Sequence, residues 1–107
     1  MGINENIVRS IVNRVLKVYK ADRIILFGSA ATGRMTRNSD IDLLIVKKGV
    51  KDRLTESVKI NEALSGMGYP FDVIVMQLDR FEETKNHIGG LAYPANKYGK
   101  VIYAKAA

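Results

Sequence analysis

The chain has 107 residues, which predicts a single domain over 1–107. Apolar residues make up 47% and charged residues 26%, as in ordinary soluble globular proteins, and the absence of cysteine excludes a disulfide scaffold and a thiolate metal site. The formal charge of +6 favours anionic partners such as nucleotides, nucleic acid or an acidic protein surface.

The first helix is predicted over 3–19, where apolar residues recur at helical spacing and arginines and a lysine occupy the other side. Arg23–Phe27 (RIILF) is a β-branched and apolar run that ends at Gly28, which predicts a buried strand. We expect 29–33 to form one helical turn.

Further strands are predicted at Ile41–Val46 (IDLLIV) and Phe71–Met76 (FDVIVM), with an amphipathic helix over 52–64 between them. The alternation of helices with short apolar strands argues for an α/β layer architecture, although it does not fix the strand directions.

The C-terminal part predicts a helix over 78–88, a short helix over 91–98 and a final strand over 101–103. The apolar runs are too short to span a bilayer, and the N-terminal sequence MGINENIVRS lacks the order of a signal peptide. We therefore expect no membrane association, and the lack of cysteine fits a reducing cytoplasm.

Three aspartates are the candidate metal ligands. Side chains alternate along a strand, so Asp40 and Asp42 are predicted to share one face while Ile41 points to the other. If the strands 41–46 and 71–76 are neighbours, Asp72 lies across from this pair. Acids gathered in this way repel one another, and a hard divalent cation such as Mg²⁺ would neutralise them. The structural alternatives are a turn capped by Asp40 and an edge-strand charge at Asp72.

Gly28 and Ser29 follow a strand directly and are the candidate phosphate-binding residues. Glycine lets the backbone approach a ligand closely, and phosphate is favoured where N–H groups point outward at the start of a helical turn. The motif is neither a Walker A loop nor a dinucleotide fingerprint, and a tight strand-to-helix turn is the structural alternative. Arg34 and Arg37 could meet a triphosphate tail or remain solvated.

Gly28-Ser29, ten intervening residues, Asp40-Ile41-Asp42 and then a strand with Asp72 resemble the nucleotidyltransferase superfamily typified by DNA polymerase β. The stretch LFGSAATGRMTRNSDIDLLIV is most similar to its compact minimal nucleotidyltransferase branch. The resemblance implies a small mixed β-sheet flanked by helices.

The resemblance also implies roles for the motif residues. Gly28 and Ser29 would bind the β- and γ-phosphates of a nucleoside triphosphate. Asp40 and Asp42 would hold two Mg²⁺ ions, and Asp72 would complete the metal site on the nucleophile side and help to deprotonate the acceptor. The reaction would be the attack of a hydroxyl on the α-phosphorus, with pyrophosphate leaving.

Minimal domains of this kind resemble the antitoxin of a gene pair whose toxin is a HEPN-type helical ribonuclease, and in that family the small domain can transfer AMP from ATP to the toxin. The short chain has little room for an acceptor-binding domain of its own, which agrees with a protein acceptor. Two other functions stay open: a binding module that masks its toxin without catalysis, and a basic nucleic-acid-binding domain. The charge favours the last, but no helix-turn-helix or aromatic RNA-binding motif accompanies it.

Overall fold

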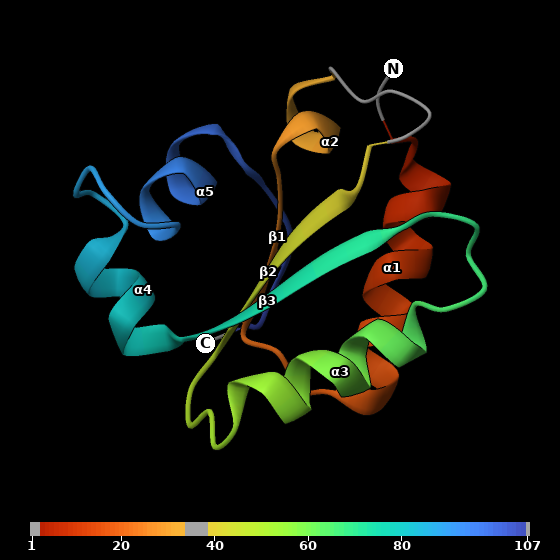
Figure 1. The fold of residues 1–107 in the computed structure, drawn as a ribbon, viewed down its shortest axis with the longest axis horizontal. Coiled ribbons are helices and arrows are strands. Elements are labelled where there is room, and N and C mark those ends of the chain that lie inside the picture. Colours follow the sequence, from red (N-terminus) through yellow and green to blue (C-terminus); the bar gives the residue numbers. More distant parts are fainter. Residues whose placement is uncertain (1–2, 34–38, 107) are drawn as a thin grey trace.

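The computed structural model describes residues 3–33 and 39–106. A four-stranded sheet forms its centre, with helices on both faces (Figure 1). The elements run in the order α1 (Glu5–Val18), β1 (Arg23–Phe27), α2 (Ser29–Thr32), β2 (Ile41–Lys47), α3 (Arg53–Ala63), β3 (Phe71–Gln77), α4 (Leu78–Thr84), α5 (Ala92–Tyr98) and β4 (Lys100–Ala104). The predicted α/β architecture, with a mixed sheet flanked by helices, is confirmed.

The strands lie in the order β3-β2-β1-β4. β1 is antiparallel to both of its neighbours, whereas β2 and β3 are parallel and α3 connects them. Parallel neighbours need such a crossover, because the chain must return to the starting end of the first strand. The parallel pair therefore places the first residues of β2 and β3 at the same end of the sheet.

Alternating side chains divide the core into two layers. α1 and α3 cover one face, where Ile24, Leu43 and Ile45 are buried. α4 and α5 cover the other face, where Leu44 and Val46 are buried. Within β2, only Asp42 and Lys47 are not fully buried.

The helix ends follow local chemistry. The Asn4 side chain accepts a hydrogen bond from the Ile7 N–H, and the Asp52 carboxylate accepts from the N–H groups of Leu54 and Thr55. Gly33 ends α2 in the left-handed region with φ +75°, as expected for a glycine that closes a helical turn.

One predicted helix is too long. The sequence predicts helix over 78–88, but α4 ends at Thr84. Phe81 is buried on α4, whereas Ile88 is 88% exposed, so a longer helix would bury no further apolar surface. Among the helices of the described ranges, none has the length and apolar character needed to cross a membrane.

Candidate active site

The parallel pairing of β2 and β3 brings two predicted carboxylates face to face. Asp42 lies directly opposite Asp72 in the register of the two strands. Side chains on directly opposed residues point to the same face of a sheet, so both carboxylates emerge on the side of α4 and α5. The condition set by the sequence, that these two strands be neighbours, is met.

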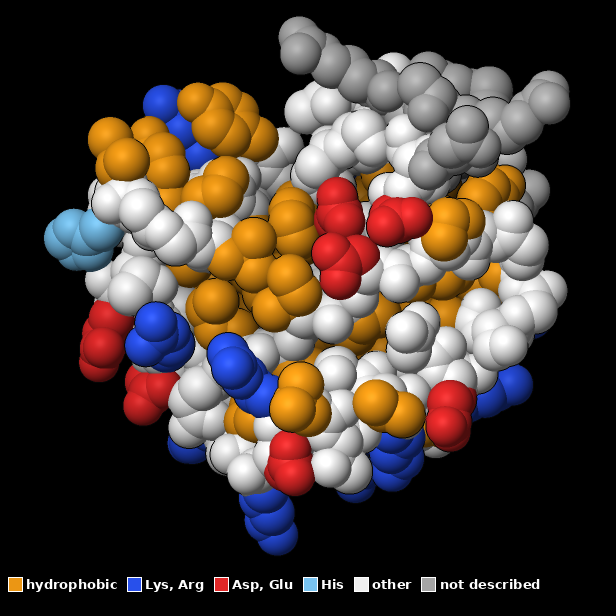
Figure 2. Space-filling view, viewed as in Figure 1, with side chains coloured by type: hydrophobic (Ala, Val, Ile, Leu, Met, Phe, Trp, Pro, Cys, Tyr) orange, Lys and Arg blue, Asp and Glu red, His pale blue; other side chains and the backbone are white. Residues whose placement is uncertain are grey.

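Asp40 lies directly before β2, outside the strand, as the predicted strand bounds 41–46 imply. β2 begins at Ile41, whose N–H donates to the Pro70 carbonyl at 2.8 Å. Asp40 is nevertheless close enough for its charge to act on Asp42. Figure 2 shows acidic side chains gathered on this open face of the molecule.

Gly28, which directly follows β1, lies against the Asp42 carboxylate. A Cβ atom added to Gly28 would lie 2.3 Å from Oδ2 of Asp42, and Gly28 has φ +68° and ψ −150°, a conformation that L side chains rarely adopt. Only glycine lets the backbone turn this close to the carboxylate. The predicted phosphate loop therefore lies directly against Asp42, one of the three predicted metal ligands.

Ser29 begins the single turn of α2. The Gly28 carbonyl accepts hydrogen bonds from the N–H groups of Ala31 and Thr32, at 3.1 and 3.2 Å. The N–H groups at the start of a helix have no acceptor within it and can serve an external anion. The candidate phosphate-binding residues thus stand beside the carboxylates, at the same end of the sheet.

The carboxylates repel one another in this arrangement. Burial away from water raises the pKa of Asp42, and the negative charges of Asp72 and Asp40 raise it further. Between the described residues, no lysine or arginine forms an ion pair with any of the three acids. Arg34 and Arg37 lie outside the described residues. The described part of the site therefore carries negative charge without a counter-charge.

The chemistry of these donors fits a hard divalent cation. Carboxylate oxygens are the ligands that Mg²⁺ prefers, and the raised pKa of Asp42 records the electrostatic strain that a cation would relieve. Within the described residues, no three His, Cys, Asp or Glu side chains already stand at the spacing that would hold one metal ion. The fit is thus one of donor type and charge.

This strain predicts how stability depends on pH in metal-free buffer. A carboxyl group with a raised pKa in the folded state binds its proton more tightly there than in the unfolded chain. The contribution of Asp42 to the free energy of unfolding should therefore fall as the pH rises from the ordinary carboxyl range through the raised pKa, and stay low above it. Urea unfolding of the wild type and of Asp42→Asn over a pH series measures this contribution as the difference between the two curves.

The difference between the wild-type and Asp42→Asn curves is needed because other acids change the stability with pH in the opposite direction. Hydrogen bonds from the Thr55 N–H and hydroxyl lower the pKa of Asp52, so Asp52 adds stability as the pH rises. Asp79→Asn, on an exposed acid of α4, serves as the control for removing a carboxylate outside the site. A wild-type curve that runs parallel to that of Asp42→Asn would contradict the prediction.

Phe27 borders the site, although the sequence predicts it only as the last residue of a strand. It pairs directly with Asp42 across β1 and β2, and it packs on the α4 and α5 side of the core. It therefore forms an apolar neighbour of the carboxylates on the β1 side. The sequence indicates only that Phe27 shares a face with Ile25, two residues earlier. Its position beside Asp42 follows from the antiparallel register of β1 and β2.

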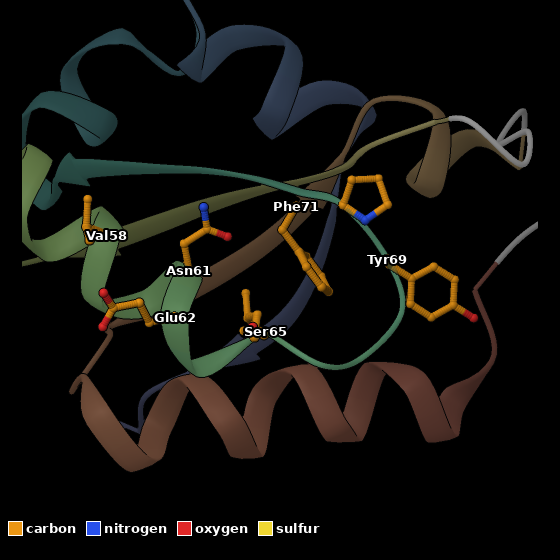
Figure 3. A pocket seen from close by; sticks show the side chains of 8 residues that line it. Val58, Asn61, Glu62, Ser65, Tyr69 and Phe71 are labelled. Atoms are coloured by element: carbon orange, nitrogen blue, oxygen red, sulfur yellow. The ribbon is translucent and has the colours of Figure 1, made fainter.

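A 460 Å³ cavity close by in sequence belongs to the other face of the sheet. Phe71, the residue before Asp72, lines it together with residues of α3 and of the loop before β3 (Figure 3). Successive strand residues point to opposite faces, so Asp72 points away from this cavity. The carboxylates lie on the open face instead.

The chain is similar in sequence to known proteins. The sequence pattern of the nucleotidyltransferase domain matches residues 8–94. A proposed protein adenylyltransferase of Methanocaldococcus jannaschii is 39% identical over 56 residues. That alignment covers 52% of this chain and 56% of the relative, so the chain spans about half the length of that protein.

Three solved structures share the fold. A toxin–antitoxin complex with AMP-PNP has a TM-score of 0.63 at 20% identity, covering 92% of this chain and 73% of the other. A mutant of the toxin–antitoxin pair MntA-HpeT also has a TM-score of 0.63, at 18% identity, covering 96% and 75%. A proposed nucleotidyltransferase from Sulfolobus solfataricus has a TM-score of 0.61 at 22% identity, covering 92% and 78%.

Proposed function

This chain belongs to the family of nucleotidyltransferase domains, and we propose from that premise that it transfers AMP from ATP to a hydroxyl group of a partner protein. The observation that carries the proposal is the contact between Gly28 and the Asp42 carboxylate, with Asp72 opposite. It joins a loop suited to phosphates with acids suited to a metal ion. Residues 1–107 would act as one catalytic domain.

Each site residue takes a role that its position supports. Ser29 and the N–H groups beside it bind the β- and γ-phosphates, and Gly28 lets the backbone approach them. Asp40 and Asp42 would hold Mg²⁺, and Asp72 would complete the site. Mg²⁺ bound there would offset the charge that develops on the phosphate oxygens and the leaving group.

Asp72 also accepts the proton of the acceptor hydroxyl. The hydroxyl oxygen forms a bond to the α-phosphorus, the bond from that phosphorus to the bridging oxygen breaks, and pyrophosphate leaves. Positioning and charge neutralisation supply most of the rate, because the protein forms no covalent bond itself.

The acceptor is proposed to be a toxin of the HEPN type encoded beside this chain, so that the chain acts as a cytoplasmic antitoxin. Two fold neighbours are toxin–antitoxin structures, one of them with AMP-PNP, and the M. jannaschii relative is a proposed protein adenylyltransferase. These likenesses support a nucleoside triphosphate as donor and a protein as acceptor.

The test uses the purified chain, the product of the neighbouring gene, Mg²⁺ and ATP that carries its radioactive phosphorus either at the α or at the γ position. Label should reach the partner protein from the α position only, and only with Mg²⁺ present. Transfer from the γ position would show a kinase instead.

Two results would overturn catalysis. The first is ATP binding that is absent or indifferent to Mg²⁺. The second is a chain with Asp40→Asn and Asp42→Asn that neutralises its toxin as well as the wild type, which would favour masking. Salt-dependent binding of DNA or RNA without any effect of nucleotide would favour the nucleic-acid-binding alternative.

A further inference from the structure

β3 is an edge strand whose outer side is open to pairing. It has β2 on one side, and no strand of the described ranges 3–33 and 39–106 lies on the other. The Ile41 N–H bonds to the Pro70 carbonyl, and groups alternate along a parallel ladder, so Asp72 and every second residue after it face β2. Phe71, Val73, Val75 and Gln77 therefore direct their N–H and carbonyl groups outward. The only charged side chain on this strand is Asp72.

An apolar strip of α3 lies along this edge. Leu54 is 76% exposed and Val58, one turn later, is 56% exposed. Leu54 lines a 190 Å³ cavity together with Val73 and Val75, and Val58 lines the 460 Å³ cavity together with Phe71 (Figure 3). The strip and the strand edge thus form one continuous surface, which we call the α3–β3 surface.

The two ends of this surface carry opposite charges. Arg53 begins α3 and lines the smaller cavity, whereas Glu62 lies near the end of α3 and lines the larger one. Neither side chain forms an ion pair with another described residue. A partner that matches this surface needs an outward-facing strand, an apolar strip, and opposite charges in the reverse order.

We propose that the α3–β3 surface binds a second copy of this chain, with the two β3 strands antiparallel about a two-fold axis. A copy turned by a half-rotation offers the same edge, the same strip and the charges reversed, as an isologous interface requires. Arg53 of each copy then meets Glu62 of the other, and Val73 pairs with Val75. The two sheets become one continuous sheet.

A single axis satisfies both the strands and the helices. Pairing Val73 with Val75 and Phe71 with Gln77 places the axis at Ile74, whereas pairing Arg53 with Glu62 places it between Ser57 and Val58. Ser57 lines the same cavity as Ile74, so these two centres lie side by side. Backbone polarity alone allows several antiparallel registers, and the pairing of Arg53 with Glu62 selects the one centred on Ile74.

The same register keeps the Asp72 carboxylates of the two copies apart. It places Asp72 opposite Met76 of the second copy, whereas a register centred on Asp72 would oppose two like charges. Asp72 points to the α4 and α5 side, away from the paired α3 helices, and Met76 of the second copy becomes its neighbour on that face. The observations behind the proposed dimer do not depend on whether the chain transfers nucleotides.

Charge reversal tests the proposal on the full chain. Sedimentation equilibrium should find a dimer for the wild type. Arg53→Glu and Glu62→Arg should each weaken it about tenfold, because each opposes like charges twice across the axis. The chain with both substitutions should regain an affinity close to that of the wild type. Restoration by the double reversal is a result that a general surface effect would not produce.

A second set of variants tests the apolar strip. Leu54→Glu with Val58→Glu should leave a monomer, while Ile88→Glu, at an exposed apolar residue elsewhere, and Val101→Glu, on the other edge strand, should leave the dimer intact. Circular dichroism confirms that each variant is folded. A monomeric wild type, a dimer indifferent to the α3 substitutions, or a dimer lost in Val101→Glu would each overturn the proposal.

Discussion

Asp42→Asn is expected to lower the rate of AMP transfer roughly a thousandfold while the chain stays folded. Asparagine keeps the size of the side chain and removes the charge that is proposed to hold Mg²⁺. It also removes the charge whose burial away from water, and whose repulsion from Asp72 and Asp40, raise the pKa of Asp42. Activity and stability should therefore change in opposite directions at neutral pH: less transfer, and a higher free energy of unfolding without metal.

Two measurements on each protein check this expectation: the transfer of α-labelled AMP to the partner, and urea unfolding with and without Mg²⁺. Mg²⁺ should raise the unfolding free energy of the wild type and have little effect on Asp42→Asn. Asp79→Asn removes an exposed acid of α4 and should match the wild type in both measurements. An Asp42→Asn chain that transfers AMP at the wild-type rate would remove Asp42 from the mechanism.

Gly28→Ala is expected to lower the free energy of unfolding by roughly 3 kcal/mol. The new Cβ would lie 2.3 Å from the Asp42 carboxylate oxygen, and the positive φ of Gly28 would strain any L side chain. Relief requires the loop or the carboxylate to move, so transfer activity should fall with stability. Urea unfolding and the labelled-AMP assay measure the two effects.

Gly49→Ala separates strain from collision, because Gly49 has φ +79° and nothing within 4 Å of an added Cβ. It should cost about 1 kcal/mol, the strain alone. In an Asp42→Ala background the carboxylate is gone, and the Cβ atom of residue 42 lies 3.6 Å from the added Cβ, an ordinary contact. Gly28→Ala should then cost less than it does in the wild-type background, because the backbone strain remains and the collision is gone. An equal loss in both backgrounds would mean that Gly28 does not act through Asp42.

The strands could be predicted closely because each is a dense apolar run with clear ends. RIILF ends at Gly28 and matches β1 residue for residue, and FDVIVM matches β3 except for the added Gln77. Strand directions could not be predicted, since alternation of helices and strands is compatible with several pairings. The end of α4 was also missed, because it depends on what Ile88 has to pack against and not on its own spacing.

The candidate site also combines features that the local sequence predicts with features that depend on the tertiary structure. The spacing of Asp40 and Asp42 indicates a shared function, and the glycine at position 28 indicates a close approach of the backbone. The sequence could state only as a condition that Asp72 lies across from Asp42, because this depends on a long-range parallel pairing through α3. What Gly28 approaches is likewise a tertiary contact, and the pairing of Phe27 with Asp42 depends on the antiparallel register of β1 and β2.

The pairing of Asp42 with Asp72 also limits where the chain can gain or lose a residue. A deletion inside β3 would invert the side-chain phase of every position on one side of it, so that either Asp72 would turn toward α3 or the apolar residues after it would turn away from the core. The loop before β3, from Ser65 to Pro70, has no alternation of side chains to preserve. The apolar residues of β3 themselves determine how the strand packs. Length variation in this chain is thus expected to be tolerated in that loop and excluded from the strand.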